Sequence, residues 1–227
     1  MARFEDRTEA GLLLARELAE YTNRPEVVVL ALPRGGVMVG AEVALALHAP
    51  LDVLLVRKLG VPGQEELAMG AIASGGIRIV NDDILGELQI SRAVLEEVTR
   101  AEQAELVRRE AAYRENHPPL PLAGKTVLLI DDGLATGASM YAAIQAVRER
   151  RPRRIVVAVP VAAPESCRFF SALVDQMVCM MTPTQFHGVG AWYEDFSQVS
   201  DETVKNLLAR ARAESSPRSE ANPPAAP

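Results

Sequence analysis

Short, continuously apolar runs alternate with segments of helical composition, and this alternation constrains the fold more than any other feature of the chain. The runs are VVVLAL from Val27, followed by LDVLLV, TVLLI, RIVVAVPV and QMVCMM. Strands that are apolar on both faces need helices on both faces, as in parallel sheets. We therefore predict an α/β fold with a mainly parallel sheet flanked by helices.

The segments between these runs carry signals for helix ends. Asp6 followed by Glu9 resembles a capping box. Pro164 suits the first turn of a helix, and Asp201 is expected to begin the last helix. These positions place helices before, between and after the predicted strands.

The middle of the chain has a different composition. RKLGVPGQEELAMG is polar and contains glycines, so it is expected to be a mobile loop, whereas GAIA and IRIV around SGG predict a hairpin. Ser91 is placed to cap a long charged helix that reaches about Tyr113, with a solvated polar face. HPPLPLAG then ends this helix as a stiff linker.

The charge and the hydropathy pattern limit the partners. The formal net charge of −6 argues against broad binding to the nucleic-acid backbone. No apolar run reaches the roughly 18 residues that cross a bilayer, and MARFEDRTEAG lacks the apolar core of a signal peptide. We expect a cytoplasmic protein without nucleic-acid or membrane partners. Cys167 and Cys179 have no metal-ligand spacing and are expected to be reduced core thiols.

The segment VLLIDDGLATGASM, from Val127 to Met140, combines the features of a ligand site. A strand that ends at Ile130 brings Asp131 and Asp132 to the carboxyl edge of the sheet, where ligands bind in such folds. The helix that follows offers amides without intrahelical partners and a partial positive charge, which suit a phosphate.

Small side chains and hydroxyl groups make this loop open to an anion. The residues concerned are Ala135, Thr136, Gly137, Ala138 and Ser139. Two carboxylates would repel the same phosphate, so Asp131 and Asp132 are expected to hold hydroxyl groups, directly or through a divalent cation. The residues therefore predict a phosphorylated polyol with a free diol.

Three other interpretations compete with this one. The acid pair could end a strand at a solvated edge, with Thr-Gly as a helix cap. A Walker loop needs Gly-Lys-Ser/Thr, and this loop has no lysine. A phosphoacceptor receiver domain, with Asp175 as acceptor, would need a later lysine, for which Lys205 is the only candidate.

VLLIDDGLATGAS resembles the signature of the type I phosphoribosyltransferases. The resemblance implies that Asp131 and Asp132 hold the ribose 2- and 3-hydroxyls of 5-phosphoribosyl 1-diphosphate, and that the loop amides hold its 5-phosphate. LPRGG, RKLG, DDGLATGAS and the ending FxxVGxWYxDF are most similar to a group of uncharacterised bacterial proteins assigned to this family.

LPRGG also resembles the pyrophosphate loop of the family, which often contains a non-proline cis peptide. Arg34, Gly35 and Gly36 would then bind the pyrophosphate, although Pro-Arg-Gly-Gly by itself indicates only a turn. Arg57 and Lys58 are similar to the basic residues that open the catalytic loop of the family, and residues 64–66 and Gly70 would lie in or near that lid.

The resemblance implies a single domain over residues 1–213, with an insertion at about 82–121 and a small hood at about 183–200. The tail, residues 214–227, is polar and rich in proline and is expected to be disordered. Phe186 or Trp192 could stack on an acceptor base, or belong to the hood core. Ala135 replaces the acid of the hypoxanthine-guanine enzymes, and VPVAAP lacks their lysine, so a 6-oxopurine acceptor is not expected.

The leading prediction is a Mg²⁺-dependent transfer of the phosphoribosyl group to an unidentified nitrogenous acceptor. Arg34 and Lys58 would stabilise the departing pyrophosphate, and Mg²⁺ would bind mainly through ligand oxygens, with Asp131 and Asp132 as candidate protein ligands. The resemblance also implies a homodimer. A sensor of phosphoribosyl diphosphate or a nucleotide is the alternative, and a hydrolase or an amine-acceptor enzyme stays open.

Overall fold

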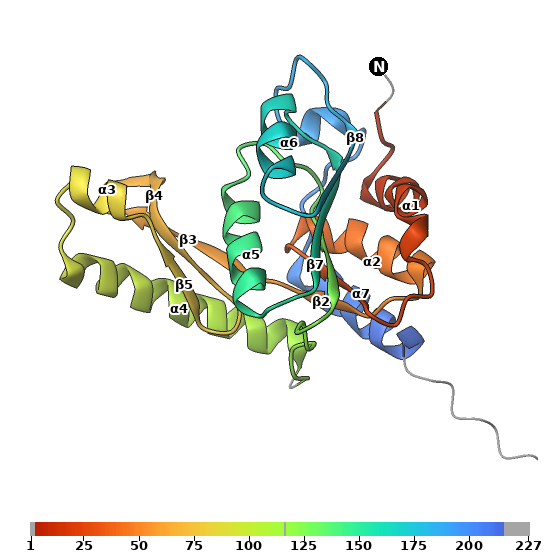
Figure 1. Cartoon of the computed structure of the whole chain (residues 1–227), viewed down its shortest axis with the longest axis horizontal. Coiled ribbons are helices and arrows are strands. Elements are labelled where there is room, and N and C mark those ends of the chain that lie inside the picture. Colours follow the sequence, from red (N-terminus) through yellow and green to blue (C-terminus); the bar gives the residue numbers. More distant parts are fainter. Residues whose placement is uncertain (1–2, 116, 216–227) are drawn as a thin grey trace, which may run out of the picture.

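The fold is built around a parallel sheet, as the apolar runs predict. The computed structural model describes residues 3–115 and 117–215 (Figure 1). The central sheet has the strand order β2-β1-β6-β7-β8, and each neighbouring pair is parallel. Its strands are β1 (Val27–Ala31), β2 (Leu51–Val53), β6 (Thr126–Ile130), β7 (Arg154–Val161) and β8 (Gln176–Met181). The α/β architecture is confirmed.

Helices cover both faces of this sheet, so that strand residues alternate between two apolar cores. Val27 and Val29 face one core, and Val28 faces the other, as the two-residue period of a strand requires. The helices of the first face are α1 (Arg7–Glu17), α2 (Gly35–Leu47) and α7 (Asp201–Ser215), and those of the second are α5 (Ala138–Glu149) and α6 (Pro164–Ser171). Two short 3-10 helices are η1 (Ala19–Tyr21) and η2 (Val189–Trp192).

The helix ends agree with the sequence signals. The Asp6 carboxylate caps α1 by accepting hydrogen bonds from the amides of residues 8 and 9. Pro164 is the first residue of α6, and α7 begins at Asp201. Ser91 caps α4 (Arg92–Arg114), the long helix predicted for this region. Local side-chain chemistry therefore defined these ends correctly.

The segment RKLGVPGQEELAMG, expected to be a mobile loop, is instead a β-hairpin of β3 (Val56–Val61) and β4 (Gln64–Ala73). Gly63, at φ +80°, lies in the turn of this hairpin, whereas Gly60 and Gly70 lie within its strands. A Cβ at Gly60 would meet the backbone of Glu65, and one at Gly70 would meet the Ile79 carbonyl, so glycine permits the close approach of strands. LDVLLV correspondingly divides between β2 and β3.

The predicted hairpin around SGG is confirmed, because β5 (Ile77–Val80) pairs antiparallel with β4. These three strands, α3 (Asp82–Glu87) and α4 project from the central sheet (Figure 1). We call residues 56–114 the arm. One side of α4 is buried, with Leu95, Leu106 and Tyr113 in the first core.

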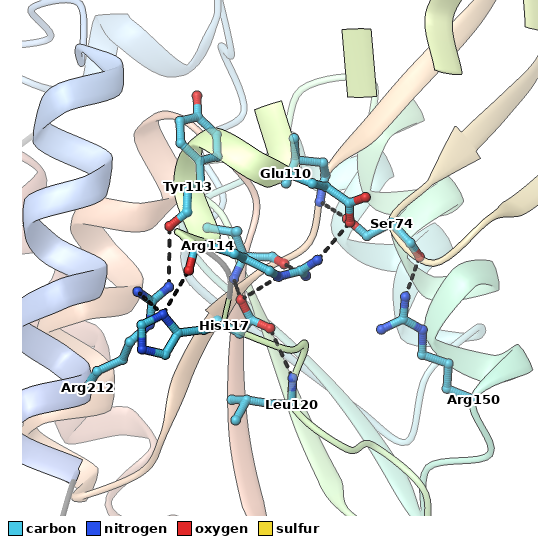
Figure 2. A network of polar contacts seen from close by, with 11 residues as sticks. Ser74, Glu110, Tyr113, Arg114, His117, Leu120, Arg150 and Arg212 are labelled. Atoms are coloured by element: carbon cyan, nitrogen blue, oxygen red, sulfur yellow. Dashed lines mark hydrogen bonds and ion pairs between the residues drawn. The ribbon is translucent and has the colours of Figure 1, made fainter. Parts of the chain in front are cut away.

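A buried polar network fixes the base of the arm (Figure 2). Arg114 at the end of α4 donates to the Asp52 carboxylate and to the Val53 carbonyl of β2, at 3.3 and 3.0 Å. Arg150, the C-cap of α5, donates to the carbonyl of Ser74, just after β4. The arm is thus attached to two separate elements of the central domain.

The two cysteines form a disulfide, so the expectation of reduced thiols is wrong. Cys167 in α6 and Cys179 in β8 are joined, with their Cα atoms 6.7 Å apart. The helix packs back over the strand and brings the two side chains together, within the Cα range of natural disulfides. The sequence spacing of two isolated cysteines does not reveal this pairing.

None of the helices in the described part of the chain is long and apolar enough to cross a membrane. The predicted tail lies outside the described residues from 216 onward, whereas Glu214 and Ser215 belong to α7.

Candidate active site

The acid pair stands where the predicted strand delivers it. β6 ends at Ile130, and Asp131 and Asp132 follow at the carboxyl edge of the central sheet. The Asp132 amide donates to Asp131 Oδ1 at 2.8 Å. Burial raises the pKa of Asp131, and the neighbouring charge of Asp132 raises it further. The pair therefore resists carrying two negative charges unless a ligand supplies donors or positive charge.

The Pro-Arg-Gly-Gly segment packs directly on this pair. A Cβ at Gly35 would overlap the Asp132 carboxylate, and one at Gly36 would lie 2.9 Å from Asp131 Oδ1. The peptide bond between Pro33 and Arg34 is cis, as in the pyrophosphate loop that the segment resembles. The Arg34 guanidinium lies 4.0 Å from the Asp201 carboxylate at the start of α7. The two predicted motifs thus meet at one sheet edge.

The loop after the acids is shaped by α6. Ser166 donates to the Ala135 carbonyl, and the backbone of Leu134 forms a bridge with Ala162 beyond β7. Gly137, at φ +75°, is the N-cap of α5, and a Cβ there would overlap Phe170 of α6. A glycine is needed at this turn for both reasons.

A cavity of about 360 Å³ opens in front of this loop. Three parts of the chain line it: the loop itself, two strands of the arm, and Val189 of η2. The lining residues are Val56, Lys58, Ala68, Gly70 and Ala71 from the arm and Asp131 with residues 133–140 from the loop. All five predicted phosphate-loop residues, from Ala135 to Ser139, border this space. The arm therefore forms one wall of the candidate site.

Neighbouring basic residues on β3 have different surroundings. Lys58 lines the cavity. Arg57 forms an ion pair with Glu102 of α4, on the other side of the strand. Alternation along a strand explains the difference, because successive side chains point to opposite faces. The structure thus places Lys58 at the cavity that Asp131 and the loop also border, and Arg57 in an ion pair with the arm helix.

Phe186 and Trp192, the residues considered for acceptor stacking, lie in a small apolar cluster with Phe4, Val161 and Tyr193. Neither is among the residues that border the 360 Å³ cavity, whereas their neighbour Val189 is. Both are partly buried. Their placement is that of hood core beside the site.

Arg7 is a site residue that the sequence interpretation missed. Its Nε lies 2.7 Å from Asp132 Oδ2, and the Tyr193 hydroxyl donates to the Asp132 carbonyl at 2.6 Å. Burial raises the pKa of Asp132, and Arg7 partly offsets that shift. Burial also raises the pKa of the Tyr193 hydroxyl. An arginine in the first turn of a helix gave no sequence signal for this contact.

The donors of the site suit a hard cation only in part. The described residues contain no group of three or more His, Cys, Asp or Glu side chains that could hold a metal ion. Two adjacent carboxylates are oxygen ligands of the kind that Mg²⁺ accepts, and Mg²⁺ commonly keeps several waters and takes ligands from substrate phosphates. The residues fit a Mg²⁺ ion that arrives with a phosphorylated ligand.

Comparison with known proteins places this geometry in a family. The family described as "Phosphoribosyl transferase domain" matches residues 7–191. The chain belongs to the type I phosphoribosyltransferases. It is 44% identical over 211 residues to the Mycobacterium tuberculosis protein named "Putative phosphoribosyl transferase Rv0571c", covering 93% of this chain and 47% of that protein. This phosphoribosyltransferase-family chain therefore spans about half the length of that relative.

Two further similarities concern a solved structure and a shorter alignment. The crystal structure of TT1426 from Thermus thermophilus superimposes with a TM-score of 0.81 at 44% identity, covering 92% of this chain and 98% of that one. The "Bifunctional protein PyrR" of Chloroflexus aurantiacus is 34% identical over 111 residues, 48% of this chain and 55% of that protein. The fold of TT1426 thus matches most of this chain.

Proposed function

We propose that this protein transfers the phosphoribosyl group of 5-phosphoribosyl 1-diphosphate to a nitrogenous acceptor and releases pyrophosphate. The observation that carries the proposal is the convergence of three groups on one sheet edge: the Asp131–Asp132 pair, the anion loop that ends at Ser139, and the Arg34-Gly35-Gly36 segment. A ligand with a diol between two phosphate groups matches this arrangement.

Each group has a distinct task in this proposal. The first amides of α5 and the hydroxyls of Thr136 and Ser139 bind the 5-phosphate. Asp131 and Asp132 accept hydrogen bonds from the ribose hydroxyls. Arg34 and the Gly35 and Gly36 amides bind the diphosphate.

The reaction exchanges one bond at C1 of the ribose for another. The bond from C1 to the diphosphate oxygen breaks, and its electron pair leaves with the pyrophosphate. The acceptor nitrogen then uses its lone pair to form the new bond to C1, and it loses a proton to solvent. Lys58, which borders the same cavity as Asp131, stabilises charge on the departing pyrophosphate. A Mg²⁺ ion bound with the substrate would neutralise diphosphate charge.

In this proposal, the arm has the task of limiting the access of water to C1. β3 and β4 stand over the loop and border the cavity with Val56, Ala68 and Ala71. These side chains are small and apolar, so they exclude water without offering a competing nucleophile. In this proposal, Arg57 joins β3 to α4 of the arm through its ion pair with Glu102. It contacts the diphosphate only if that ion pair opens.

The proposal is tested by binding first and by turnover second. Calorimetry with 5-phosphoribosyl 1-diphosphate, with and without Mg²⁺, is expected to give Mg²⁺-dependent binding in the micromolar range, about −8 kcal/mol. Pyrophosphate release is then measured with a panel of nucleobases and amines. Binding with release for one acceptor supports the transferase. Binding without release across the panel would favour a sensor, and no binding would overturn the proposal.

A further inference from the structure

Arg7 is buried at the start of α1, with only 7% of its surface exposed. Its guanidinium is held by an ion pair, a hydrogen bond and the rings of Phe196 and Tyr193. Nε is paired with Asp132 Oδ2 at 2.7 Å, Nη1 donates to the Ser197 carbonyl at 2.9 Å, and the group lies over the Phe196 ring at 3.8 Å from the centroid. A buried arginine with such partners is held in one orientation.

The segment that holds Arg7 is itself fixed by the N-terminal residues. The backbone of Phe4 pairs with Tyr193, and the Phe4 amide donates to the Trp192 carbonyl at 3.0 Å. The Phe4 and Tyr193 rings lie 5.4 Å apart, and the Tyr193 and Phe196 rings lie 5.1 Å apart. The segment WYEDF, residues 192–196, therefore supports Arg7, and its Tyr193 and Phe196 rings contact the guanidinium.

Two residues of this region, Arg7 and Tyr193, contact Asp132. Arg7 contacts the carboxylate, and Tyr193 donates its hydroxyl to the carbonyl of the same residue at 2.6 Å. The Asp132 carboxylate is paired with Arg7, and the Asp132 amide donates to Asp131 Oδ1. Arg7 thus links α1 to the acid pair.

We propose that Arg7 is a positioning residue of the phosphoribosyl site: it fixes the orientation of the Asp132 carboxylate beside Asp131, and Phe196 holds Arg7 in place. This inference rests on the proposed function, because it assigns Asp132 to a ribose hydroxyl. Arg7 itself contacts no substrate in it. The N-terminal helix and the hood segment thereby become part of the site, although neither carries a residue of the family signature.

The geometry fixes the expected effect of losing Arg7. Without Arg7, the Asp132 carboxylate loses the partner that orients it and can turn away from the ribose hydroxyl. Loss of Arg7 must therefore weaken binding, and a substitution that keeps a positively charged donor should recover part of the loss.

The test compares Arg7→Gln and Arg7→Lys with the native chain. Arg16→Gln, an exposed arginine on the same helix, is the matched control. Affinity for 5-phosphoribosyl 1-diphosphate is measured by calorimetry, and the Tm of each variant is measured beside it. Arg7→Gln is expected to lose about tenfold in affinity. Arg7→Lys is expected to recover part of this loss, and the control is expected to bind like the native chain.

A second variant removes the support of Arg7 and leaves Arg7 itself in place. Phe196→Leu removes the ring under the guanidinium. It is expected to weaken binding in the same direction, and it replaces Arg7→Gln if that variant does not fold.

The outcomes separate this inference from the proposed function. No binding by the native chain would overturn both. Native binding together with unchanged affinity in folded Arg7→Gln would overturn the role of Arg7 alone. An equal loss of affinity in Arg7→Gln and Arg7→Lys, together with an equally lowered Tm, would show that Arg7 is merely structural.

Discussion

Gly35 packs so closely on Asp132 that a Cβ at position 35 would overlap the carboxylate oxygen Oδ2. The contact joins the end of β1 to the end of β6, two strands that are neighbours in the sheet and about a hundred residues apart in sequence. The pyrophosphate segment and the ribose acids are thus parts of one packed unit.

We predict that Gly35→Ala strongly reduces binding of 5-phosphoribosyl 1-diphosphate, by about tenfold or more. The added methyl group must displace the Asp132 carboxylate or the Pro-Arg-Gly-Gly segment, and either shift spoils the geometry. Calorimetry of the folded variant measures the effect. Gly86→Ala is the matched control, since a Cβ there meets no atom within 4 Å. Native affinity in Gly35→Ala would contradict the packing argument.

Asp131→Asn is predicted to stabilise the protein above neutral pH. Burial raises the pKa of Asp131, so the native state binds this proton more tightly than the unfolded chain does. Its contribution to stability is complete below the unfolded value of about 3.9 and is lost as the pH rises through the higher native value. The amide never ionises, and its oxygen can still accept from the Asp132 amide.

Thermal unfolding at about pH 8 and about pH 4 checks this prediction. A gain of about 1 kcal/mol would raise Tm by about 2–4 °C at the higher pH for a chain of this size, and the gain should fade at the lower pH. The variant should also bind 5-phosphoribosyl 1-diphosphate poorly, as expected when a site residue costs stability. Asp195→Asn is the control, because hydrogen bonds from Ser197 lower the pKa of Asp195. A lower Tm for Asp131→Asn than for the native chain at about pH 8 would show that the predicted direction of the stability change is wrong.

Lys58→Ala and Arg57→Ala are predicted to act on different properties. Lys58 borders the cavity, so its loss should reduce kcat/KM by about a hundredfold through weaker stabilisation of the leaving group. Arg57 pairs with Glu102 at a partly exposed position, so its loss should cost about 1 kcal/mol or less and change kcat/KM little. Steady-state kinetics and thermal unfolding of both variants decide the matter. A larger kinetic loss in Arg57→Ala would show that Arg57 leaves Glu102 and enters the site.

The sequence was sufficient where a short stretch determines its own geometry. A buried strand followed by two acids and a Thr-Gly turn places Asp131 and the loop at a sheet edge, and the Asp6, Ser91 and Pro164 signals define helix starts. Contacts between distant segments were not accessible. Arg7 and Asp132 are separated by 125 positions, and nothing near Arg7 indicates which carboxylate it will meet.

The arm illustrates a second limit of sequence interpretation. Glycines in a polar stretch are typical of loops, but Gly60 and Gly70 permit close contact between paired strands. Their meaning depends on partners elsewhere in the hairpin. A one-dimensional pattern cannot distinguish these two uses of glycine, so a segment expected beside the site was predicted as a loop and not as a hairpin.

The disulfide between Cys167 and Cys179 leads to a prediction about α6 and the loop that it supports. In the non-reduced, denatured protein we expect no reactive thiol, and after reduction both cysteines of the chain should react. A crosslink over 12 positions is expected to contribute about 3 kcal/mol by restricting the unfolded chain, so reduction should lower Tm. The Cys167→Ser, Cys179→Ser double variant is the control, because the reductant should not change its Tm.

Ser166, next to Cys167, donates a hydrogen bond to the Ala135 carbonyl of the anion loop. Reduction should therefore also weaken the binding of phosphate at the anion loop. The far edge of the sheet should change little. Two reactive thiols before reduction would contradict the crosslink and restore the original expectation of free thiols.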